Sequence, residues 1–317
     1  MRVLVTGAGG FVGPYLVRAL AAKGHEVHGL VRSAAVPTRL AELSVVTHRG
    51  DLLDGSGIDT IVADVAPDAI CHLAALSFVP DAERDPQTAY RVNVDGTLAV
   101  LSALRVHVPK ARLLFVGSSD AYGAVLDDEL PIDEDVPLRP LTVYGASKAA
   151  ADLTASQWGR AYGLDVVRVR PFNHAGPGQG PSFVCPALAK QVADIEAGRQ
   201  APVLRIGNLD PVRDLSDVRD VAAGYVALLE RGMPGHVYNL CSGVGRSICE
   251  VVDVFRSLAR VPIDVVQDPA LVRRVEVPRV VGSAERATAD TGWHPAIPFE
   301  RTAAELLAWW RDDGQAT

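Results

Sequence analysis

One short segment limits the possible folds of this chain more than any other: Thr6-Gly7-Ala8-Gly9-Gly10-Phe11-Val12-Gly13. It joins an apolar run at residues 2–6 to a helical pattern near 12–23. Gly7 permits a tight turn, Gly10 lets the backbone approach a pyrophosphate, and Gly13 lets the helix lie against the strand. Free N–H groups at the start of a helix favour an anion. Although its spacing is GxxGxxG, the segment predicts a dinucleotide-binding unit whose cofactor contacts include Phe11 and Val12.

The first half of the chain alternates short apolar runs with longer helical patterns. The runs are rich in Val, Leu and Ile and lack polar alternation, as strands buried on both faces do. Predicted strands cover 2–6, 26–31, 45–49, 69–73, 112–116 and 166–170, and predicted helices lie near 12–23, 57–66, 86–107 and 143–162. The order indicates an α/β fold with a parallel, doubly wound sheet of the Rossmann type.

The pattern changes after Pro171. Residues 171–182 are rich in Gly and Pro, and helices are predicted over 183–198 and near 299–311. A length of 317 residues suggests about two domains. We expect residues 1–170 to form the dinucleotide-binding domain and residues 171–317 to form mostly a smaller substrate domain, with a strand near 236–240 returning to the main sheet.

Composition argues against several classes of protein. The net charge of −7 argues against a nucleic-acid-binding protein, which usually has a basic face. No segment offers about 18 uncharged apolar residues to span a membrane, and no signal peptide precedes the first strand. The four cysteines lack the close spacing of a zinc or redox site, and the eight histidines form no metal-binding pair. We expect a soluble, cytoplasmic protein with reduced thiols and no metal.

The end of the second predicted strand bears on the choice of cofactor. NAD enzymes usually place an acidic residue there to bind the ribose 2′-hydroxyl. This chain has Arg32 instead, which we predict binds the 2′-phosphate of NADP; a surface arginine without a ligand is the alternative. Asp51 and Leu52 are expected to flank the adenine, and Ala74 and Ala75 to let the cofactor pass closely. NADP(H) is therefore the preferred cofactor, with NAD(H) as the alternative.

Tyr144 and Lys148 stand four residues apart, so a helix places them on one face. Free tyrosine has a pKa of about 10, too high for efficient proton exchange at neutral pH. A nearby lysine ammonium and an oxidised nicotinamide favour the phenolate and lower that pKa. We predict that Tyr144 moves a proton while the cofactor moves a hydride, and that Lys148 also holds the nicotinamide ribose.

The fifth predicted strand ends in a polar segment, Gly117-Ser118-Ser119-Asp120. Ser118 is predicted to donate a hydrogen bond to the reacting carbonyl oxygen beside Tyr144, and Ser119 to assist at the substrate. Asp120 has three candidate roles: a general base, a ligand of a substrate hydroxyl, or a residue that stabilises the turn. The sequence alone does not choose among them.

These motifs together resemble the extended short-chain dehydrogenase/reductase superfamily. The glycine turn, HLAAL at 72–76, NVDGT at 93–97, the Ser118 segment and YGASK at 144–148 occur in that family's order. The resemblance covers nearly the whole chain. It implies that Asn93 supports the active site next to the cofactor.

The second half resembles the GDP-mannose branch of the superfamily, through motifs such as RPFNH at 170–174 and VYNLCSG at 237–243. The resemblance implies that Asn173 contacts the substrate and that Lys190 holds its nucleotide. It also implies that Arg213 and Arg273 bind the diphosphate and that Glu276 binds guanine or its ribose. The family often has Arg-Pro before this glutamate, whereas this chain has Arg-Arg, so Arg274 is an alternative ligand.

Within that branch, the pattern is most similar to the reductases that convert GDP-4-dehydro-6-deoxy-D-mannose to GDP-D-rhamnose. The first alternative is a GDP-mannose 4,6-dehydratase, which needs a further base, typically Glu, in the position of Asp120. Asp is one methylene shorter, and misplacing a base by about 1 Å can cost about 10²-fold in rate. Other nucleotide-sugar reductases or epimerases are further alternatives, as is a non-catalytic NADP-sensing protein.

The predicted helices near 86–107 and 143–162 carry apolar stripes that include Tyr90, Leu98 and Leu153. Core packing explains part of each stripe. The resemblance implies that two such helix pairs form a four-helix homodimer interface.

Overall fold

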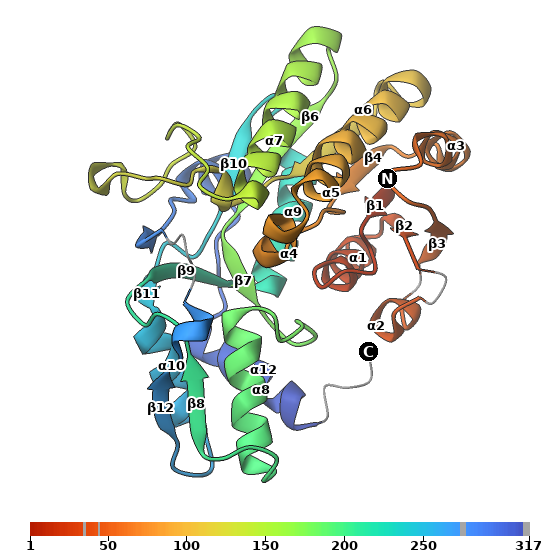
Figure 1. The fold of residues 1–317 in the computed structure, drawn as a ribbon. Helices are drawn as coiled ribbons and strands as arrows, with labels where there is room; N and C mark the ends of the chain where they lie inside the picture. Colours follow the sequence, from red (N-terminus) through yellow and green to blue (C-terminus); the bar gives the residue numbers. More distant parts are fainter. Residues whose placement is uncertain (34–35, 44, 273–276, 313–317) are drawn as a thin grey trace.

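The computed structural model describes residues 1–33, 36–43, 45–272 and 277–312. Seven parallel strands form its main sheet: β1 (Arg2–Thr6), β2 (Glu26–Val31), β3 (Val46–Arg49), β4 (Ala69–His72), β5 (Arg112–Val116), β6 (Val166–Pro171) and β10 (Val237–Leu240). Their order across the sheet is β10-β6-β5-β4-β1-β2-β3 (Figure 1). The predicted parallel sheet is confirmed, and every predicted strand lies within one residue of its expected ends.

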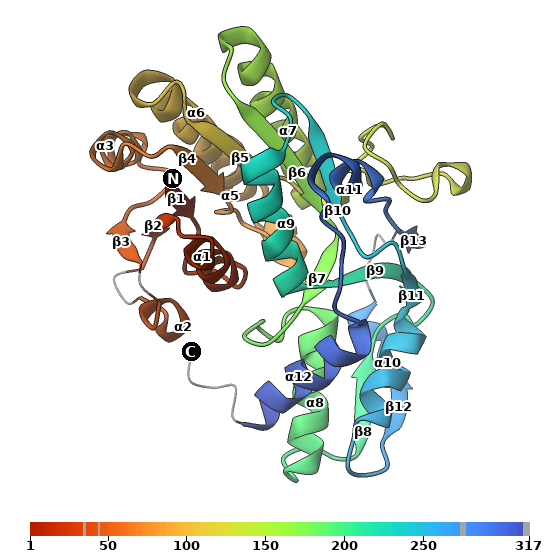
Figure 2. The same ribbon diagram turned by 180° about the vertical axis from the view of Figure 1, so that it is seen from behind.

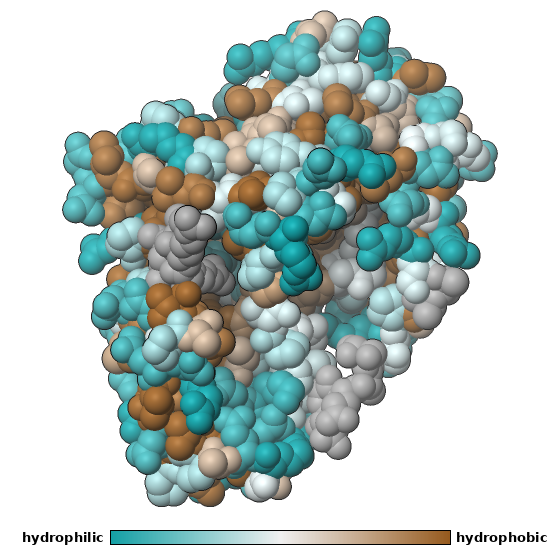
Figure 3. Space-filling model, viewed as in Figure 1, coloured by the Kyte–Doolittle hydropathy of each residue, from teal (hydrophilic) through white to brown (hydrophobic). Residues whose placement is uncertain are grey.

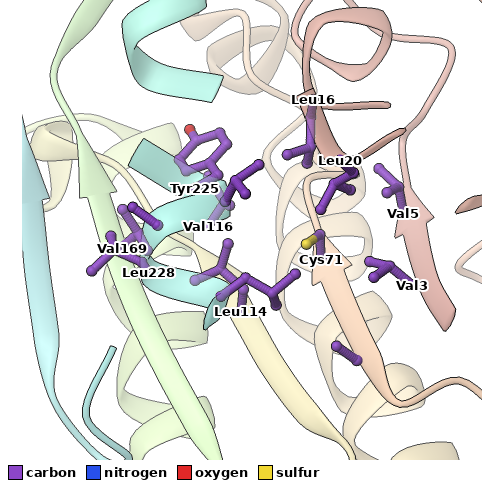
Figure 4. Close-up of a cluster of buried hydrophobic side chains, with 14 of the residues drawn as sticks. Val3, Val5, Leu16, Leu20, Cys71, Leu114, Val116, Val169, Tyr225 and Leu228 are labelled. Atoms are coloured by element: carbon purple, nitrogen blue, oxygen red, sulfur yellow. The ribbon is translucent and has the colours of Figure 1, made fainter. Parts of the chain in front are cut away.

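Helices cover both faces of this sheet. On one face lie α1 (Gly13–Ala22) and α9 (Val218–Arg231), and on the other lie α3 (Gly55–Val65), α6 (Gly96–His107) and α7 (Val143–Tyr162) (Figures 1 and 2). Val3 and Val5 of β1 join a buried cluster with Leu16 of α1 (Figure 4), whereas Leu4 joins the cluster of α3 and α6. Burial on both faces explains why the central strands show no polar alternation; the edge strand β3 is mostly exposed.

α9 is the largest element that the sequence left unplaced. Its buried residues Val221, Tyr225 and Leu228 follow a helical spacing and pack on the same cluster as Leu16 (Figure 4). The short helix α11 (Glu285–Thr291) joins this cluster through Ala287. More of residues 171–317 therefore packs on the main sheet than strand β10 alone, because α1 leaves part of its apolar face to be covered.

The remaining C-terminal elements enclose a second core. Its helices are α8 (Val184–Glu196), α10 (Ile248–Ser257) and α12 (Phe299–Arg311), which bury side chains such as Val192, Phe255 and Leu306. Strands β8 (Val203–Ile206) and β12 (Asp264–Gln267) pair in parallel. Strand β9 (Val212–Asp217) pairs with β7 (Asn173–Ala175), β11 (Gly245–Ser247) and β13 (Arg279–Val280).

The helix expected over 86–107 consists of three pieces. α5 (Pro86–Tyr90) leads into a π-helical turn at Arg91–Asp95, and α6 follows. Two short helices that the sequence did not predict are α2 (Thr38–Ala41) and α4 (Val79–Arg84), and short 3-10 turns lie at Ser119–Ala121, Asp127–Glu129 and Pro269–Leu271. A π-helical turn inside a helix often marks a functional site.

The face of the molecule in Figure 3 carries hydrophilic and hydrophobic side chains side by side. Among the residues that the structure describes, no helix combines the length and the apolar character needed to cross a membrane.

Candidate active site

The glycine turn between β1 and α1 has no room for a side chain at Gly7 or Gly13. Gly7 adopts a φ of +72°, and a Cβ there would lie 2.8 Å from backbone atoms of Ala74. A Cβ on Gly13 would overlap the carbonyl of Ala8, so α1 starts directly against β1. The backbone N–H of Gly10 donates to the carbonyl of Gly7 at 2.9 Å. The turn therefore presents main chain at the ends of β1 and β4, as the approach of a pyrophosphate requires.

A cavity of about 430 Å³ opens beside this turn, at the carboxyl ends of the main strands. Open α/β sheets bind their ligands at this edge. The residues selected from the sequence that line the cavity come from five loops of the main sheet, from α7 and from β7: Gly7, Gly10, Phe11, Val12, Gly13, Arg32, Asp51, Leu52, Ala74, Ala75, Ser118, Ser119, Asp120, Tyr144, Lys148 and Asn173. The structure thus brings the expected cofactor residues and the expected catalytic residues to one cavity.

Asn93 lies behind this cavity rather than in its wall. Its side chain accepts from the N–H of Leu76 at 2.8 Å and donates to the hydroxyl of Ser147 at 2.8 Å. Asn93 belongs to the π-helical turn, and Ser147 belongs to the catalytic helix α7. The asparagine therefore ties α7 to the loop after β4.

The remaining substrate residues lie farther out. Lys190 on α8 pairs with Asp194 at 2.5 Å, and Arg213 on β9 donates to the carbonyl of Val277 at 2.8 Å. Neither is among the residues that line the cavity in the described chain. The calls on Arg273, Arg274 and Glu276 fall at 273–276, outside the described residues.

The catalytic candidates come from two elements. Tyr144 stands in the first turn of α7, whose N-cap, Thr142, accepts from the N–H of Gly145 at 3.0 Å. Ser118 follows β5, and its hydroxyl lies close enough to the Tyr144 phenol to favour the phenolate and lower its pKa. One helical turn beyond Tyr144, the Lys148 ammonium donates to the carbonyl of Val116 at 2.5 Å. The expected grouping of serine, tyrosine and lysine is thus present in space.

Burial shifts the pKa of Tyr144 in the direction opposite to the lowering predicted for a nearby lysine ammonium and an oxidised nicotinamide. Burial, with a further contribution from the Asp120 carboxylate, raises the pKa of Tyr144 well above its usual range, and the nearby Ser118 hydroxyl opposes this shift only in part. Desolvation outweighs the effect expected of the lysine, because Lys148 is itself buried and bonded to a carbonyl. The phenol is therefore protonated at neutral pH, which is the form that a proton donor needs.

Burial lowers the pKa of the Lys148 ammonium to about 8, while the carboxylate of Asp152 opposes this shift. The lysine therefore changes charge near the physiological range.

Asp120 lies in the short turn after Ser118, whose hydroxyl accepts from the Asp120 N–H at 3.1 Å. Its carboxylate is close enough to raise the pKa of Tyr144, and it lines the cavity. This position fits a base or a substrate ligand at the reacting centre.

Other residues that line the cavity include Phe172, His174, Gln179 and Tyr225, which are not among the site residues predicted from the sequence. The first three belong to the Gly- and Pro-rich segment 171–182, in which His174 lies on β7, and aromatic and amide side chains among the glycines were the available signal. Tyr225 comes from α9, whose period of buried residues identifies a helix but not what it packs against.

The segment after β6 contacts the glycine turn, α1 and α2, at the side of the cavity that is predicted to bind the cofactor. The Tyr15 hydroxyl of α1 donates to the carbonyl of Pro177 at 2.7 Å, and the rings of Phe11 and His174 stack at 6.1 Å between centroids. The Arg39 guanidinium lies over the Tyr15 ring at 4.7 Å and against Gly178, where a Cβ would overlap it. These contacts join the two halves of the chain around one cavity.

Comparison with known proteins supports this picture. The model of the family described as GDP-mannose 4,6 dehydratase matches residues 4–306. A GDP-6-deoxy-D-mannose reductase from Pseudomonas aeruginosa is 40% identical over 309 residues, which cover 98% of this chain and 97% of the relative. A GDP-mannose 4,6-dehydratase from Vibrio cholerae is 28% identical, with 96% of this chain and 92% of the relative covered.

Solved structures agree. The structure of RMD from Pseudomonas aeruginosa complexed with NADPH superposes with a TM-score of 0.86 and 36% identity, covering 99% of this chain and 100% of the other. A Thermus thermophilus UDP-glucose 4-epimerase in complex with NAD gives a TM-score of 0.88 and 32% identity, covering 98% and 99%. The Rossmann-type fold and the predicted family are confirmed. This chain belongs to the GDP-mannose 4,6-dehydratase family of NAD(P)-dependent nucleotide-sugar enzymes, which has the short-chain dehydrogenase/reductase fold.

Proposed function

We propose that this chain is a reductase that uses NAD(P)H to convert the C4 ketone of GDP-4-dehydro-6-deoxy-D-mannose to the alcohol of GDP-D-rhamnose. The observation that carries this proposal is the grouping of Ser118, Tyr144 and Lys148 in one cavity beside the glycine turn. A reduction needs an acid at this point, and the full-length similarity to a GDP-6-deoxy-D-mannose reductase supports the substrate.

The residues of the chain divide the work as follows. The bound nicotinamide supplies the hydride. Tyr144 gives its proton to the C4 oxygen, and the Ser118 hydroxyl stabilises the negative charge that develops on that oxygen. Lys148 holds a positive charge one turn along α7, which stabilises the phenolate that remains. The buried setting excludes water and strengthens these interactions.

NADPH is the cofactor that the cavity favours. Arg32 lines it at the end of β2, where NAD enzymes usually carry an acid, and its guanidinium suits a 2′-phosphate. The related RMD structure contains NADPH, whereas other related structures contain NAD.

We assign the substrate contacts in two groups. Asn173 lines the cavity and is placed to meet the sugar or its diphosphate. Lys190 and Arg213 lie outside it and would bind the nucleotide farther along, once Lys190 exchanges its bond to Asp194 for a phosphate or base.

The test is incubation with GDP-4-dehydro-6-deoxy-D-mannose and NADPH while the absorbance of the reduced nicotinamide is followed. We expect a steady fall with formation of GDP-D-rhamnose. No consumption of NADPH would refute the proposal.

The second candidate is the dehydratase, which the family description favours, whereas Asp120 is one methylene shorter than the glutamate that a dehydratase typically has at this position. Incubation with GDP-mannose and catalytic NADP tests it, because a dehydratase forms the 4-keto product without net consumption of cofactor. Absence of that product leaves the reductase as the assignment.

A homodimer through a four-helix interface is the proposed assembly. α6 and α7 pack side by side in Figure 1, and they leave large apolar side chains exposed, among them Val106, Leu153 and Tyr162. Two copies of this pair would bury these side chains together.

A cytoplasmic location is the proposed one. Cys71, Cys185 and Cys241 are buried thiols, Cys249 is an exposed thiol, and none of the four is in a disulfide. Unpaired thiols are typical of proteins kept in a reducing compartment.

A further inference from the structure

A cluster of buried charges lies behind the catalytic helix, outside the residues that line the cavity. Asp152 of α7 accepts from Arg168 at 2.7 Å and from Arg170 at 3.0 and 3.1 Å. Arg170 also donates to the Tyr122 hydroxyl at 3.1 Å, and that hydroxyl donates to Asn239 at 2.8 Å. Asp152 is 1% exposed, and the two arginines are 7% and 4% exposed. Charges buried this deeply need partners, and here two cations share one carboxylate.

Asp152 stands one helical turn after Lys148, so both side chains leave the same face of α7. A Cβ on Gly117 would lie 3.5 Å from the Asp152 carboxylate, so this carboxylate approaches the end of β5. The residue before Gly117 is Val116, whose carbonyl accepts the bond from the Lys148 ammonium. The carboxylate and the ammonium therefore meet the same stretch of backbone from the same helix.

The Val116 carbonyl and the Phe115 ring, whose centroid lies 5.1 Å from the ammonium, also favour the charged form of Lys148. The titratable groups around it favour its neutral form or leave it unchanged. On β4, burial and the lysine itself lower the pKa of His72 to about 3, so this imidazole is neutral, and burial raises the pKa of Cys71 so that its thiol is neutral as well. Tyr144 on α7 and Tyr225 on α9 are neutral phenols, because burial raises the pKa of each. Arg168 and Arg170 on β6 are like charges, and Asp120, beyond Tyr144, lies nearer the phenol.

We propose that Asp152 is a positioning residue for the reaction: its buried carboxylate, shared with Arg168 and Arg170, keeps the Lys148 ammonium charged and aligned with Val116. The two arginines determine how strongly the Asp152 carboxylate stabilises the Lys148 ammonium. Removing the carboxylate exposes Lys148 to two uncompensated cations. Removing Arg168 lets the Asp152 carboxylate stabilise the Lys148 ammonium more strongly, so the charged form of the lysine persists to higher pH.

Asp152→Asn and Arg168→Met test this pair of effects. Activity that needs the ammonium is lost as pH rises through the pKa of Lys148, so the alkaline midpoint reports on that group; Tyr144 loses its proton only at higher pH. We expect Asp152→Asn to move this midpoint down by about one pH unit. We expect Arg168→Met to move it up by about half a unit, because Asp152 keeps Arg170.

The control is Asp165→Asn, which breaks a similar ion pair, with Arg112 at 2.9 Å, at the opposite end of the strands. It should lower stability without moving the midpoint. A purely structural role for Asp152 would lower kcat or the melting temperature at every pH and leave the midpoint in place; that result overturns the proposal. If Asp152→Asn does not fold, Arg168→Met decides alone, and a midpoint that stays or falls overturns the proposal.

The assignment rests on the proposed function for its turnover readout, so a second readout is independent of it. The affinity for NADPH is measured by fluorescence titration across the same pH range, because Lys148 lines the cofactor cavity. Absence of turnover by the wild-type chain with the GDP ketosugar counts against the proposed function only. If NADPH binding then shows a lower midpoint for Asp152→Asn and a higher midpoint for Arg168→Met, the proposed role of Asp152 is supported. Identical midpoints in the wild type and both variants overturn that role.

Discussion

Burial keeps the Tyr144 phenol protonated, so replacing this tyrosine removes a proton donor from the cavity. Tyr144→Phe deletes the proton donor and keeps the ring that packs in the cavity wall. We expect turnover of the ketosugar to fall by about 10²–10⁴-fold, the usual contribution of general acid catalysis. NADPH affinity, measured by fluorescence titration, should change little. Unchanged turnover would remove Tyr144 from the mechanism.

The lowered pKa of Lys148 predicts how kcat/KM for the same reaction depends on pH. Burial lowers its pKa to about 8, so the ammonium is present below that pH and is lost above it. Since the pKa of Tyr144 is raised, the phenol stays protonated throughout. We expect kcat/KM to be level between about pH 6 and 7 and to fall by about tenfold per unit above about pH 8. A rate that rises through pH 8 to 9 contradicts this assignment.

At the scale of elements, the glycine turn depends on two separate constraints. Gly7 needs a positive φ and also lies against the backbone of Ala74, whereas Gly24, with a φ of +78°, faces open space. Gly24→Ala should therefore cost about 1–2 kcal/mol of unfolding free energy from backbone strain alone. Gly7→Ala should cost about 1–3 kcal/mol more, because the methyl group displaces the loop after β4.

Denaturant unfolding of both variants measures this difference, and NADPH titration follows the loss of the binding turn. Equal destabilisation of the two variants would mean that the contact with Ala74 does not constrain the turn.

At the scale of the whole molecule, the exposed apolar residues of α6 and α7 predict the assembly. Leu153 on α7 is 60% exposed, and Leu126, on the loop after Gly123, is 55% exposed. We expect the wild-type chain to have the mass of a dimer in light scattering at micromolar concentration. Leu153→Glu should shift it to the mass of a monomer, because two charges would meet at the interface. The matched change Leu126→Glu should leave the dimer intact, and a wild-type monomer would exclude the four-helix interface.

Much of this architecture could be predicted from local pattern alone. The central strands of the main sheet are apolar runs covered on both faces, whereas the edge strand β3 is mostly exposed. The placement of α9 could not be predicted in this way. Its stripe of Val221, Tyr225 and Leu228 defines an amphipathic helix, but a stripe carries no information on which apolar face will cover it.

Local sequence specifies which chemical groups meet at the cavity. The spacing of Gly7, Gly10 and Gly13 specifies a turn in which main chain meets a ligand, and the four-residue spacing from Tyr144 to Lys148 places both on one helix face. Parallel strands end at one edge of the sheet, so residues after each strand converge there. These are consequences of local geometry and of sheet topology, which short-range sequence encodes.

The protonation states of these groups depend on the tertiary structure. The raised pKa of Tyr144 and the lowered pKa of Lys148 come from burial, which depends on packing between residues far apart in the chain. The hydrogen bond from Tyr15 to Pro177 and the ion pairs of Asp152 with Arg168 and Arg170 likewise join distant segments. Desolvation and long-range pairing exist only once the chain has folded, because no local segment removes these groups from water.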